Sequence, residues 1–307
     1  MADGGAPQDW DFTLLPFAAL ILRLLDAVGA EAVVEVGADR GDFTAELLAW
    51  GERGGRRVTA IDPEPAPELL KLVERRPELN LIRQPSPEAL EEALPAGAII
   101  LDGDHNYWTL SGELRAIAER SEGADLPLLL LHDIGWPHSR RDTYYAPDRV
   151  PEEHRQPLAQ DALVTPGNSG TASEGIRFGW AAKREGGPGN GILTAVEDFL
   201  AEREGLRLAV VPAFFGLGVL WPEDAPWADA VAGIVDPWDS APLLARLEEV
   251  RIAQVVNRTR MNRQQELLRN MLNSRAFTVA ERIAAIRGKG TTPFSRERIR
   301  RALGDSP

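Results

Sequence analysis

Residues 31–50 read EAVVEVGADRGDFTAELLAW: a short apolar run, a glycine turn and then a helical pattern. The same unit recurs along the first 131 residues, and short apolar runs that alternate with helices indicate strands buried on both faces of a parallel sheet. The chain is therefore expected to be an α/β protein with a doubly wound, mostly parallel sheet. The expected strands are 31–36, 57–61, 79–83, 98–101 and 126–131, and the helices between them are 42–51, 67–76, 87–94 and 107–120.

The rest of the chain extends this sheet and adds helices at both ends. Two strand-like runs, 206–212 and 214–221, are joined by a very short turn, which predicts an antiparallel pair at the sheet edge. Further helical patterns lie at 12–28, 192–204, 241–271, 274–287 and 295–303. We expect a tail and helix over 1–29, an α/β domain over 30–236 and a helical extension over 237–307.

One segment, 133–175, interrupts the alternation. It is rich in Pro, Arg, Asp and Gly, and it is too long for an ordinary connector in a compact domain. We expect a lid or binding loop. Trp136, Arg140, Arg141 and Tyr144 are its candidate substrate contacts, because guanidinium and aromatic groups suit polyhydroxylated or anionic molecules. A solvated loop anchored by aromatic side chains is the alternative.

Composition and charge exclude several classes of protein. Cys is absent, so disulfides and thiolate chemistry are excluded, and the long apolar segment that a membrane span requires is lacking. Residues 246–307 carry 14 Lys and Arg against 6 Asp and Glu, whereas residues 1–245 carry 20 against 41. An acidic body disfavours nucleic acid as a partner. We expect a cytoplasmic homo-oligomer whose basic end packs on acidic surface, with anion binding as the alternative.

Acidic and glycine residues follow the first two strands. Glu35, Gly37, Asp39 and Gly41 form an E-x-G-x-x-x-G turn, in which Asp occupies a position where a dinucleotide fingerprint needs glycine. Pyrophosphate is therefore disfavoured, and a cationic ligand is favoured. Asp62, at the end of the second strand, is placed to accept hydrogen bonds from a ribose diol. A plain strand-to-helix turn would need the same glycines.

A second group of polar residues follows the fourth and fifth strands: Asp102, Asp104 and His105, then His132 and Asp133. Because these strands are expected to be neighbours, the five side chains should converge on one rim of the sheet. Two carboxylates with open positions favour Mg²⁺, and an imidazole favours Mn²⁺ or a similar ion. Such an ion lowers the pKa of a bound hydroxyl, and either His105 or Asp104 could act as the general base.

These two groups together resemble the S-adenosylmethionine site of class I methyltransferases. They also resemble the metal-dependent O-methyltransferases typified by macrocin O-methyltransferase, and the related rhamnosyl O-methyltransferase and cephalosporin hydroxylase group. The resemblance implies a seven-stranded Rossmann-like sheet. It also implies an O-methyltransferase in natural-product biosynthesis that acts on a hydroxyl of a sugar or other natural product. The acceptor would be a small molecule or a glycan.

The same resemblance implies roles for individual residues. S-adenosylmethionine would contact Glu35, Gly37, Asp39, Gly41, Asp62, Gln84, Ser86 and Asp102, and Mg²⁺ or Mn²⁺ would bind Asp102, His132 and Asp133. His132 departs from the acidic residue that the family has at this position. Two other classes remain open: a non-catalytic interaction protein that works through its basic end, and a metal-dependent hydrolase that uses the same Asp and His residues.

Overall fold

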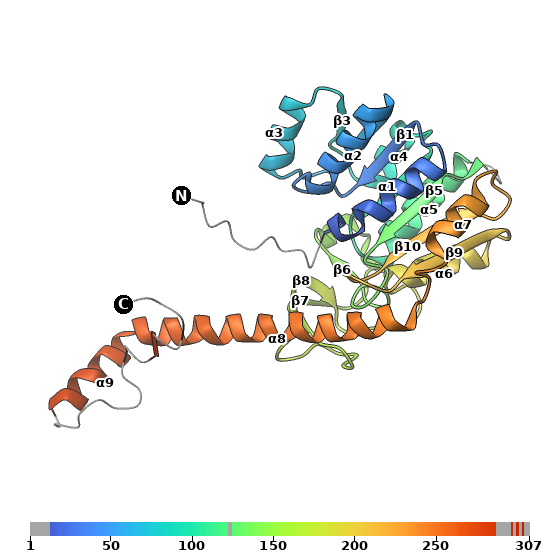
Figure 1. Cartoon of the computed structure of the whole chain (residues 1–307). Coiled ribbons are helices and arrows are strands. Elements are labelled where there is room, and N and C mark those ends of the chain that lie inside the picture. Colours follow the sequence, from blue (N-terminus) through green and yellow to red (C-terminus); the bar gives the residue numbers. More distant parts are fainter. Residues whose placement is uncertain (1–12, 122–124, 287–295, 297–298, 301–302, 304–307) are drawn as a thin grey trace.

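The computed structural model describes residues 13–121, 125–286, 296, 299, 300 and 303, and it contains a central seven-stranded sheet (Figure 1). The strand order is β3-β2-β1-β4-β5-β10-β9. All neighbours are parallel except those of β10, which is antiparallel to β5 and to the edge strand β9. In sheet order the strands span Leu79–Ile82, Arg57–Ile61, Ala32–Val36, Ala98–Leu101, Leu128–His132, Leu217–Pro222 and Leu206–Val211.

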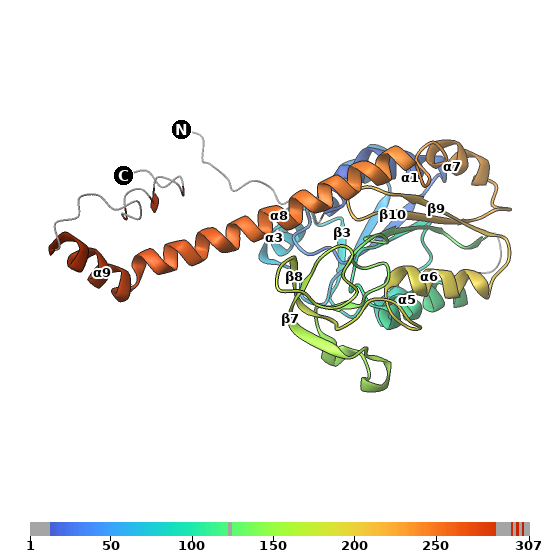
Figure 2. The same ribbon diagram turned by 90° about the horizontal axis from the view of Figure 1, so that it is seen from below.

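Helices cover both faces of this sheet (Figure 2). Successive strand residues point to opposite faces: in β1, Val33 belongs to one apolar core, and Val34 and Val36 belong to the other. One face is covered by α1 (Ala18–Ala27), α2 (Asp42–Gly54), α3 (Pro67–Arg75) and α7 (Ala228–Val235). The other is covered by α4 (Ser86–Ala93), α5 (Tyr107–Glu119) and α6 (Ile192–Ala201).

The predicted fold class is confirmed. The sheet is doubly wound, seven-stranded, Rossmann-like and mostly parallel, and its antiparallel strand lies in the pair at the edge. The helix α7 was not expected, because its eight residues are too few for a helical period to be recognised in the sequence. The polar start at 1–11 and most of the expected helix at 295–303 lie outside the described residues.

The segment 133–175 is not only a loop. Together with the residues that follow it, it forms a second, three-stranded antiparallel sheet in the order β6-β8-β7. The strands are β6 (Thr143–Tyr144), β7 (Leu158–Val164) and β8 (Ile176–Ala182), and the short 3₁₀ turns η4 (Pro147–Arg149) and η5 (Glu152–His154) lie between β6 and β7. The sequence pattern missed these strands because the apolar residues of β7 do not alternate with polar ones: the polar pair Gln160 and Asp161 interrupts them.

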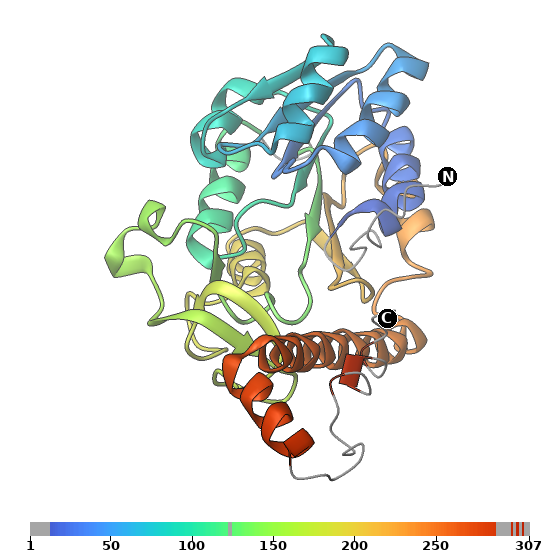
Figure 3. The same ribbon diagram turned by 90° about the vertical axis from the view of Figure 1, so that its left-hand side faces the viewer.

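The chain ends in a long helix, α8 (Pro242–Asn273), which extends away from the body and carries α9 (Arg275–Ile286) at its far end (Figures 1 and 3). Ile252 and Val255 of α8 are buried in a small apolar cluster with Ile176 and Phe215, which joins α8 to β8 and to the end of the sheet. No described helix is long and apolar enough to span a bilayer.

Candidate functional site

The turn after β1 lies against the end of β4. Gly37 has a φ of 84°, and a Cβ at this position would lie 2.0 Å from the carbonyl oxygen of Asp102. Glycine is therefore required here for both conformation and space. Gly41 also has a positive φ of 82°, but its missing Cβ makes room for the side chain of Leu69 in α3, at 3.0 Å. Gly41 thus supports helix packing, and its expected contact with a ligand stays a prediction.

Asp62, at the end of β2, organises this turn. Its Oδ2 accepts a hydrogen bond from the amide of Asp39 at 2.7 Å, and its Oδ1 accepts one from the amide of Glu64 at 2.8 Å. Asp39 is itself in the left-handed region, with a φ of 42°, and burial followed by the charge of Asp62 raises its pKa. Each carboxylate oxygen of Asp62 keeps a second lone pair for a ligand.

Glu35 is buried beneath the turn on the side of α2. Its side chain accepts a hydrogen bond from Thr44 Oγ1 at 2.5 Å, and only 2% of the residue is exposed. Burial raises its pKa to about 8, so the group is mostly a neutral acid at pH 7. Glu35 therefore supports the turn from below and does not present a charge to a ligand.

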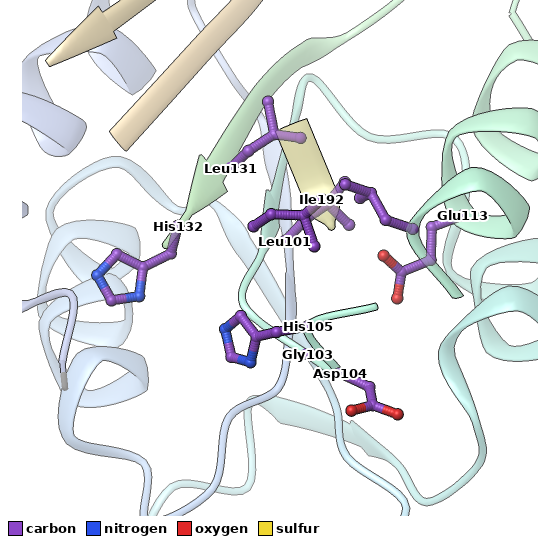
Figure 4. Close-up of a pocket in the computed structure, with 9 residues that line it drawn as sticks. Leu101, Gly103, Asp104, His105, Glu113, Leu131, His132 and Ile192 are labelled. Carbon is purple, nitrogen blue, oxygen red and sulfur yellow. The ribbon is translucent and has the colours of Figure 1, made fainter. Parts of the chain in front are cut away.

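The residues expected after β3 differ in their surroundings. Gln84 is exposed, whereas Ser86 is buried and donates a hydrogen bond to Glu113 of α5. Glu113 was not predicted, and burial raises its pKa to about 7. It borders a cavity of about 10 Å³ that Gly103 and His132 also line (Figure 4). A volume of this size holds about one water molecule.

Five side chains form a compact group at the ends of β4 and β5, here named the His/Asp cluster: Asp102, His105, His132, Asp133 and His138. All except Asp102 are buried. Asp133 is the central member, and its φ of 56° turns the chain sharply as β5 ends. The sequence placed four of these residues together, and the structure adds His138 from the segment that follows β5.

Close contacts connect the members of the His/Asp cluster. His132 Nδ1 lies 2.9 Å from Asp102 Oδ1 and 3.5 Å from Asp133 Oδ1. The second oxygen of Asp133, Oδ2, lies 3.2 Å from His105 Nε2 and 3.5 Å from His138 Nε2. The rings of His105 and His138 are 4.4 Å apart between centroids.

The cluster shifts the pKa values of its members in opposite directions. Burial favours the neutral ring of His105, but its contacts with Asp102 and Asp133 outweigh burial and raise its pKa to about 10. Burial followed by the charge of His105 lowers the pKa of His138 to about 3. Although burial acts against it, the charge of His132 and the contact with His105 keep the pKa of Asp133 below its usual range.

Several polar atoms of the cluster lack hydrogen-bond partners. His105 Nε2, His132 Nε2 and Asp133 Oδ1 are buried and make no hydrogen bond of acceptable geometry. Buried polar atoms normally have partners, so these atoms indicate a missing ligand. Imidazole and carboxylate groups are the donors that divalent transition metals prefer, and this donor set fits a cation such as Mn²⁺.

Asp104 does not join the cluster. In Figure 4 its side chain points away from His132, and its Oδ1 accepts a hydrogen bond from the amide of Tyr145 at 3.0 Å. The N-terminus of α5 is capped by Asn106, whose side chain accepts a hydrogen bond from the amide of Thr109 at 2.8 Å. Asp104 thus holds the backbone of the segment after β5 in place.

The four expected substrate contacts are largely engaged within the protein. Arg140 forms a two-bond ion pair with Glu197, at 2.6 Å for each bond. Arg141 is fully buried and donates to backbone carbonyls, including that of Ala182 at 2.6 Å. Tyr144 is buried and donates to Asp142 at 2.7 Å. Trp136 is half-buried and packs against the small apolar cluster that joins α8 to β8.

The exposed aromatic residue beside the cluster is Tyr145, the neighbour of the residue that was expected. It is 78% exposed, and its ring centroid lies 6.0 Å from that of His105. Sequence reasoning singled out Tyr144, because it had no signal for which of the two adjacent tyrosines faces solvent. His138 follows Asp133 by only five residues, and this closeness in sequence could have marked it as a member of the His/Asp cluster.

Comparisons with known proteins give weak structural similarities. No family model and no curated protein matches the chain. The methyltransferase PaMTH1 of Podospora anserina, with SAH bound, is 12% identical; the match covers 72% of this chain and 83% of that one, with a TM-score of 0.45. An O-methyltransferase family protein from Burkholderia thailandensis is 12% identical, with coverages of 69% and 57% and a TM-score of 0.40.

A third solved structure is the O-methyltransferase NcsB1 from neocarzinostatin biosynthesis, in complex with S-adenosylmethionine and a naphthoic acid. It is 16% identical, and the match covers 68% of this chain and 57% of that chain, with a TM-score of 0.36. At these identities and TM-scores, the function has to be inferred from the side chains of this chain.

Proposed function

We propose that this chain is an S-adenosylmethionine-dependent O-methyltransferase assisted by a divalent metal ion. The observation that carries the proposal is the contact between the Gly37 turn and Asp102, where a single added Cβ would lie 2.0 Å from the Asp102 carbonyl oxygen. The turn that suits a nucleoside cofactor therefore adjoins the His/Asp cluster. A methyl donor and a hydroxyl held at the cluster would be neighbours, and positioning is the main task in methyl transfer.

The proposed cofactor site combines direct contacts with supporting residues. The remaining lone pairs of Asp62 would accept from the ribose hydroxyls, and Asp39 and Asp102 would lie near the positive charges of the cofactor. Gln84, exposed after β3, would lie near the adenine. The remaining residues of the set, Glu35, Gly37, Gly41 and Ser86, would shape the site, since each is buried or engaged in packing.

The proposed metal ligands are Asp102, His132 and Asp133, whose donor atoms all lie within 4.8 Å of one another. When bound, Mg²⁺ or Mn²⁺ lowers the pKa of a coordinated hydroxyl and fixes its orientation. The imidazole of His132 favours Mn²⁺ over Mg²⁺. The short contact between His132 and Asp102, at 2.9 Å, keeps two of the three donors together.

The proposal assigns no general base, which differs from the expectation for His105 and Asp104. Although burial acts against them, contacts with Asp102 and Asp133 raise the pKa of His105 to about 10, so its ring already carries a proton at neutral pH while these carboxylates hold no metal ion. Asp104 points away from the cluster and accepts a hydrogen bond from the amide of Tyr145. The acceptor hydroxyl would release its proton to water, and Asp104 would position the segment that carries Tyr145.

The proposed acceptor is a hydroxyl of a sugar or other natural product, as a free small molecule or on a glycan. Tyr145, exposed beside His105, offers a flat surface on which a sugar or aromatic ring could stack. The acidic body, which carries 20 basic and 41 acidic residues over 1–245, supports a partner other than nucleic acid. A cytoplasmic homo-oligomer remains part of the proposal.

Calorimetric titration with S-adenosylmethionine and S-adenosylhomocysteine tests the cofactor assignment. Micromolar binding of either is expected, and labelled methyl transfer to candidate sugars in the presence of Mn²⁺ then tests the reaction. Asp133→Asn should abolish turnover and leave cofactor binding within a few-fold. Asp148→Asn, at an exposed site on η4, is the matched control. If neither nucleoside binds, the methyltransferase proposal fails.

A metal-dependent hydrolase is the second candidate. Three imidazoles in one buried cluster favour it, because a cluster so rich in histidine suits the metal sites of hydrolases. This candidate predicts metal binding without affinity for S-adenosylmethionine, so the same titrations separate the two functions.

A further inference from the structure

The His/Asp cluster contains two sets of three ligands that overlap in one residue. Among the residues that the structure describes, one set is Asp102, His132 and Asp133, and the other is His105, Asp133 and His138. The donor atoms within each set lie within 4.8 Å of one another, but the two sets do not merge into one group of five. The cluster therefore offers two neighbouring cation positions that share Asp133.

The two oxygens of Asp133 face different sets. Oδ1 lies 3.5 Å from His132 Nδ1, on the side of Asp102. Oδ2 lies 3.2 Å from His105 Nε2 and 3.5 Å from His138 Nε2. This is the arrangement of a bridging carboxylate, in which each oxygen serves a different ion, as happens in two-metal sites.

The second set is held in place by outer contacts of the kind that orient metal-binding histidines. His138 Nδ1 lies 2.9 Å from the hydroxyl of Thr143, which leaves Nε2 directed at Asp133. The amide of Thr143 donates to the backbone carbonyl of His105 at 2.9 Å, so the same residue ties both histidines of the set together. Such partners fix ring orientation and tautomer.

An unpartnered atom gives independent evidence for a ligand at this position. His105 Nε2, a member of the second set, is buried and makes no hydrogen bond, although it lies close to two carboxylates. A cation between the imidazoles and the carboxylate would satisfy both kinds of donor atom. Without one, this buried nitrogen would lack the partner that folded proteins normally supply.

We propose that His105, Asp133 and His138 bind a second divalent cation, so that the cluster is a dinuclear centre bridged by Asp133. The inference rests on the metal site of the proposed function and adds a role for His138, which that function does not use. Two imidazoles and one carboxylate with open positions favour Mn²⁺, Fe²⁺ or Zn²⁺ over Mg²⁺. As a ligand, His105 would bind the ion through a neutral imidazole, so the cation displaces the proton from Nε2.

Titration of the chelator-treated full-length protein with Mn²⁺ tests the proposal, with stoichiometry read by calorimetry and coupling read by electron paramagnetic resonance. We expect two Mn²⁺ per chain and a spectrum broadened by coupling between the bridged ions. His138→Ala should bind one Mn²⁺ and give the six-line spectrum of an isolated ion. His154→Ala is the matched control, because His154 is exposed and stacks on Trp108 outside the cluster.

Asp102→Asn probes the opposite set and covers the case in which His138→Ala fails to fold. This variant should retain one Mn²⁺ at the second set. The dinuclear centre would be overturned if the unmodified protein bound only one Mn²⁺ per chain. In that case His138→Ala would leave this ion in place, or Asp102→Asn would lose it. Binding of S-adenosylmethionine is measured separately in every variant, so failure of the second cation is distinct from failure of the proposed function.

Discussion

Asp142 Oδ1 accepts a hydrogen bond from the backbone amide of Gly191 at 2.7 Å, across 49 residues of sequence. The same oxygen accepts from the amide of Tyr107 at 2.8 Å, so one carboxylate meets the N-termini of both α5 and α6. Helix N-termini carry unpaired amides and partial positive charge, which an acidic group stabilises. This contact fixes the segment after β5 against the main domain, and with it the positions of His138 and Tyr145.

Asp142→Ala should destabilise the protein by about 3 kcal/mol, because each buried amide left without a partner costs about 1–3 kcal/mol. The loss of the Tyr144 hydroxyl partner adds to this cost. Urea unfolding, followed by circular dichroism, measures the effect. Asp148→Ala is the control. The side chain of Asp148 is fully exposed in η4, so this variant should be about as stable as the unmodified protein. Equal stability of the two variants would contradict the anchoring role.

Gly37→Ala should be more damaging than an alanine at another left-handed glycine. The added Cβ would meet the Asp102 carbonyl, and the φ of 84° would be strained as well. Gly55→Ala, at a φ of 65° with nothing within 4 Å, isolates the strain alone, which costs roughly 1–2 kcal/mol. In urea unfolding, we expect Gly37→Ala to lose at least about 2 kcal/mol more of the free energy of unfolding than Gly55→Ala. Gly37→Ala should also lose cofactor binding. A similar loss in both would show that the contact with Asp102 is unimportant.

The sheet could be predicted because its strands are nearly continuous apolar runs. Each residue of β4 and β5 is buried, so the pattern needs no knowledge of the partner strand. Asp102 and the pair His132 and Asp133 followed from the same reasoning, since they end neighbouring parallel strands. Their closeness, 2.9 Å between His132 and Asp102, is a consequence of the register of β4 against β5.

The segment after β5 could not be predicted, because its shape depends on contacts between distant residues. Arg141 has the composition of a substrate contact, but its guanidinium is buried against the carbonyls of Ser169 and Ala182. Tyr144 and Tyr145 are adjacent in sequence, yet the pairing of β6 with β8 buries the first and leaves the second exposed. No local period separates such residues into buried and exposed.

Glu35 makes the stability of the protein depend on pH. Its folded-state pKa of about 8 lies above the ordinary value of 4.5, so its contribution is fully present below pH 4.5 and is lost as the pH rises through 8. A shift of this size corresponds to at most about 5 kcal/mol. Glu35→Gln keeps an acceptor for the Thr44 hydroxyl and removes the titration. The free energy of unfolding should therefore fall less steeply between pH 5 and 8 in the variant.

Urea unfolding at several pH values measures this difference between the two proteins. Glu78→Gln is the control: Glu78 is an exposed carboxylate paired with Arg76, and its pKa is lowered, so it stays ionised between pH 5 and 8 and its replacement should leave the slope in that range unchanged. Parallel stability curves for the unmodified protein and Glu35→Gln would mean that Glu35 is ionised in the folded protein. The carboxylate would then be available to a cationic ligand, as the sequence alone suggested.

Tyr145→Ala should weaken binding of the acceptor while sparing the cofactor. The ring is exposed beside His105, and the loss of one aromatic contact is worth about 1–1.5 kcal/mol, or roughly a 10-fold rise in KM. Tyr145→Phe should stay within about 2-fold of the unmodified protein if stacking is the main contribution. Steady-state methyl transfer to the best sugar acceptor measures KM and kcat, and calorimetry measures affinity for S-adenosylhomocysteine. A fall in kcat with unchanged KM would instead place Tyr145 among the groups that act on the reacting atoms.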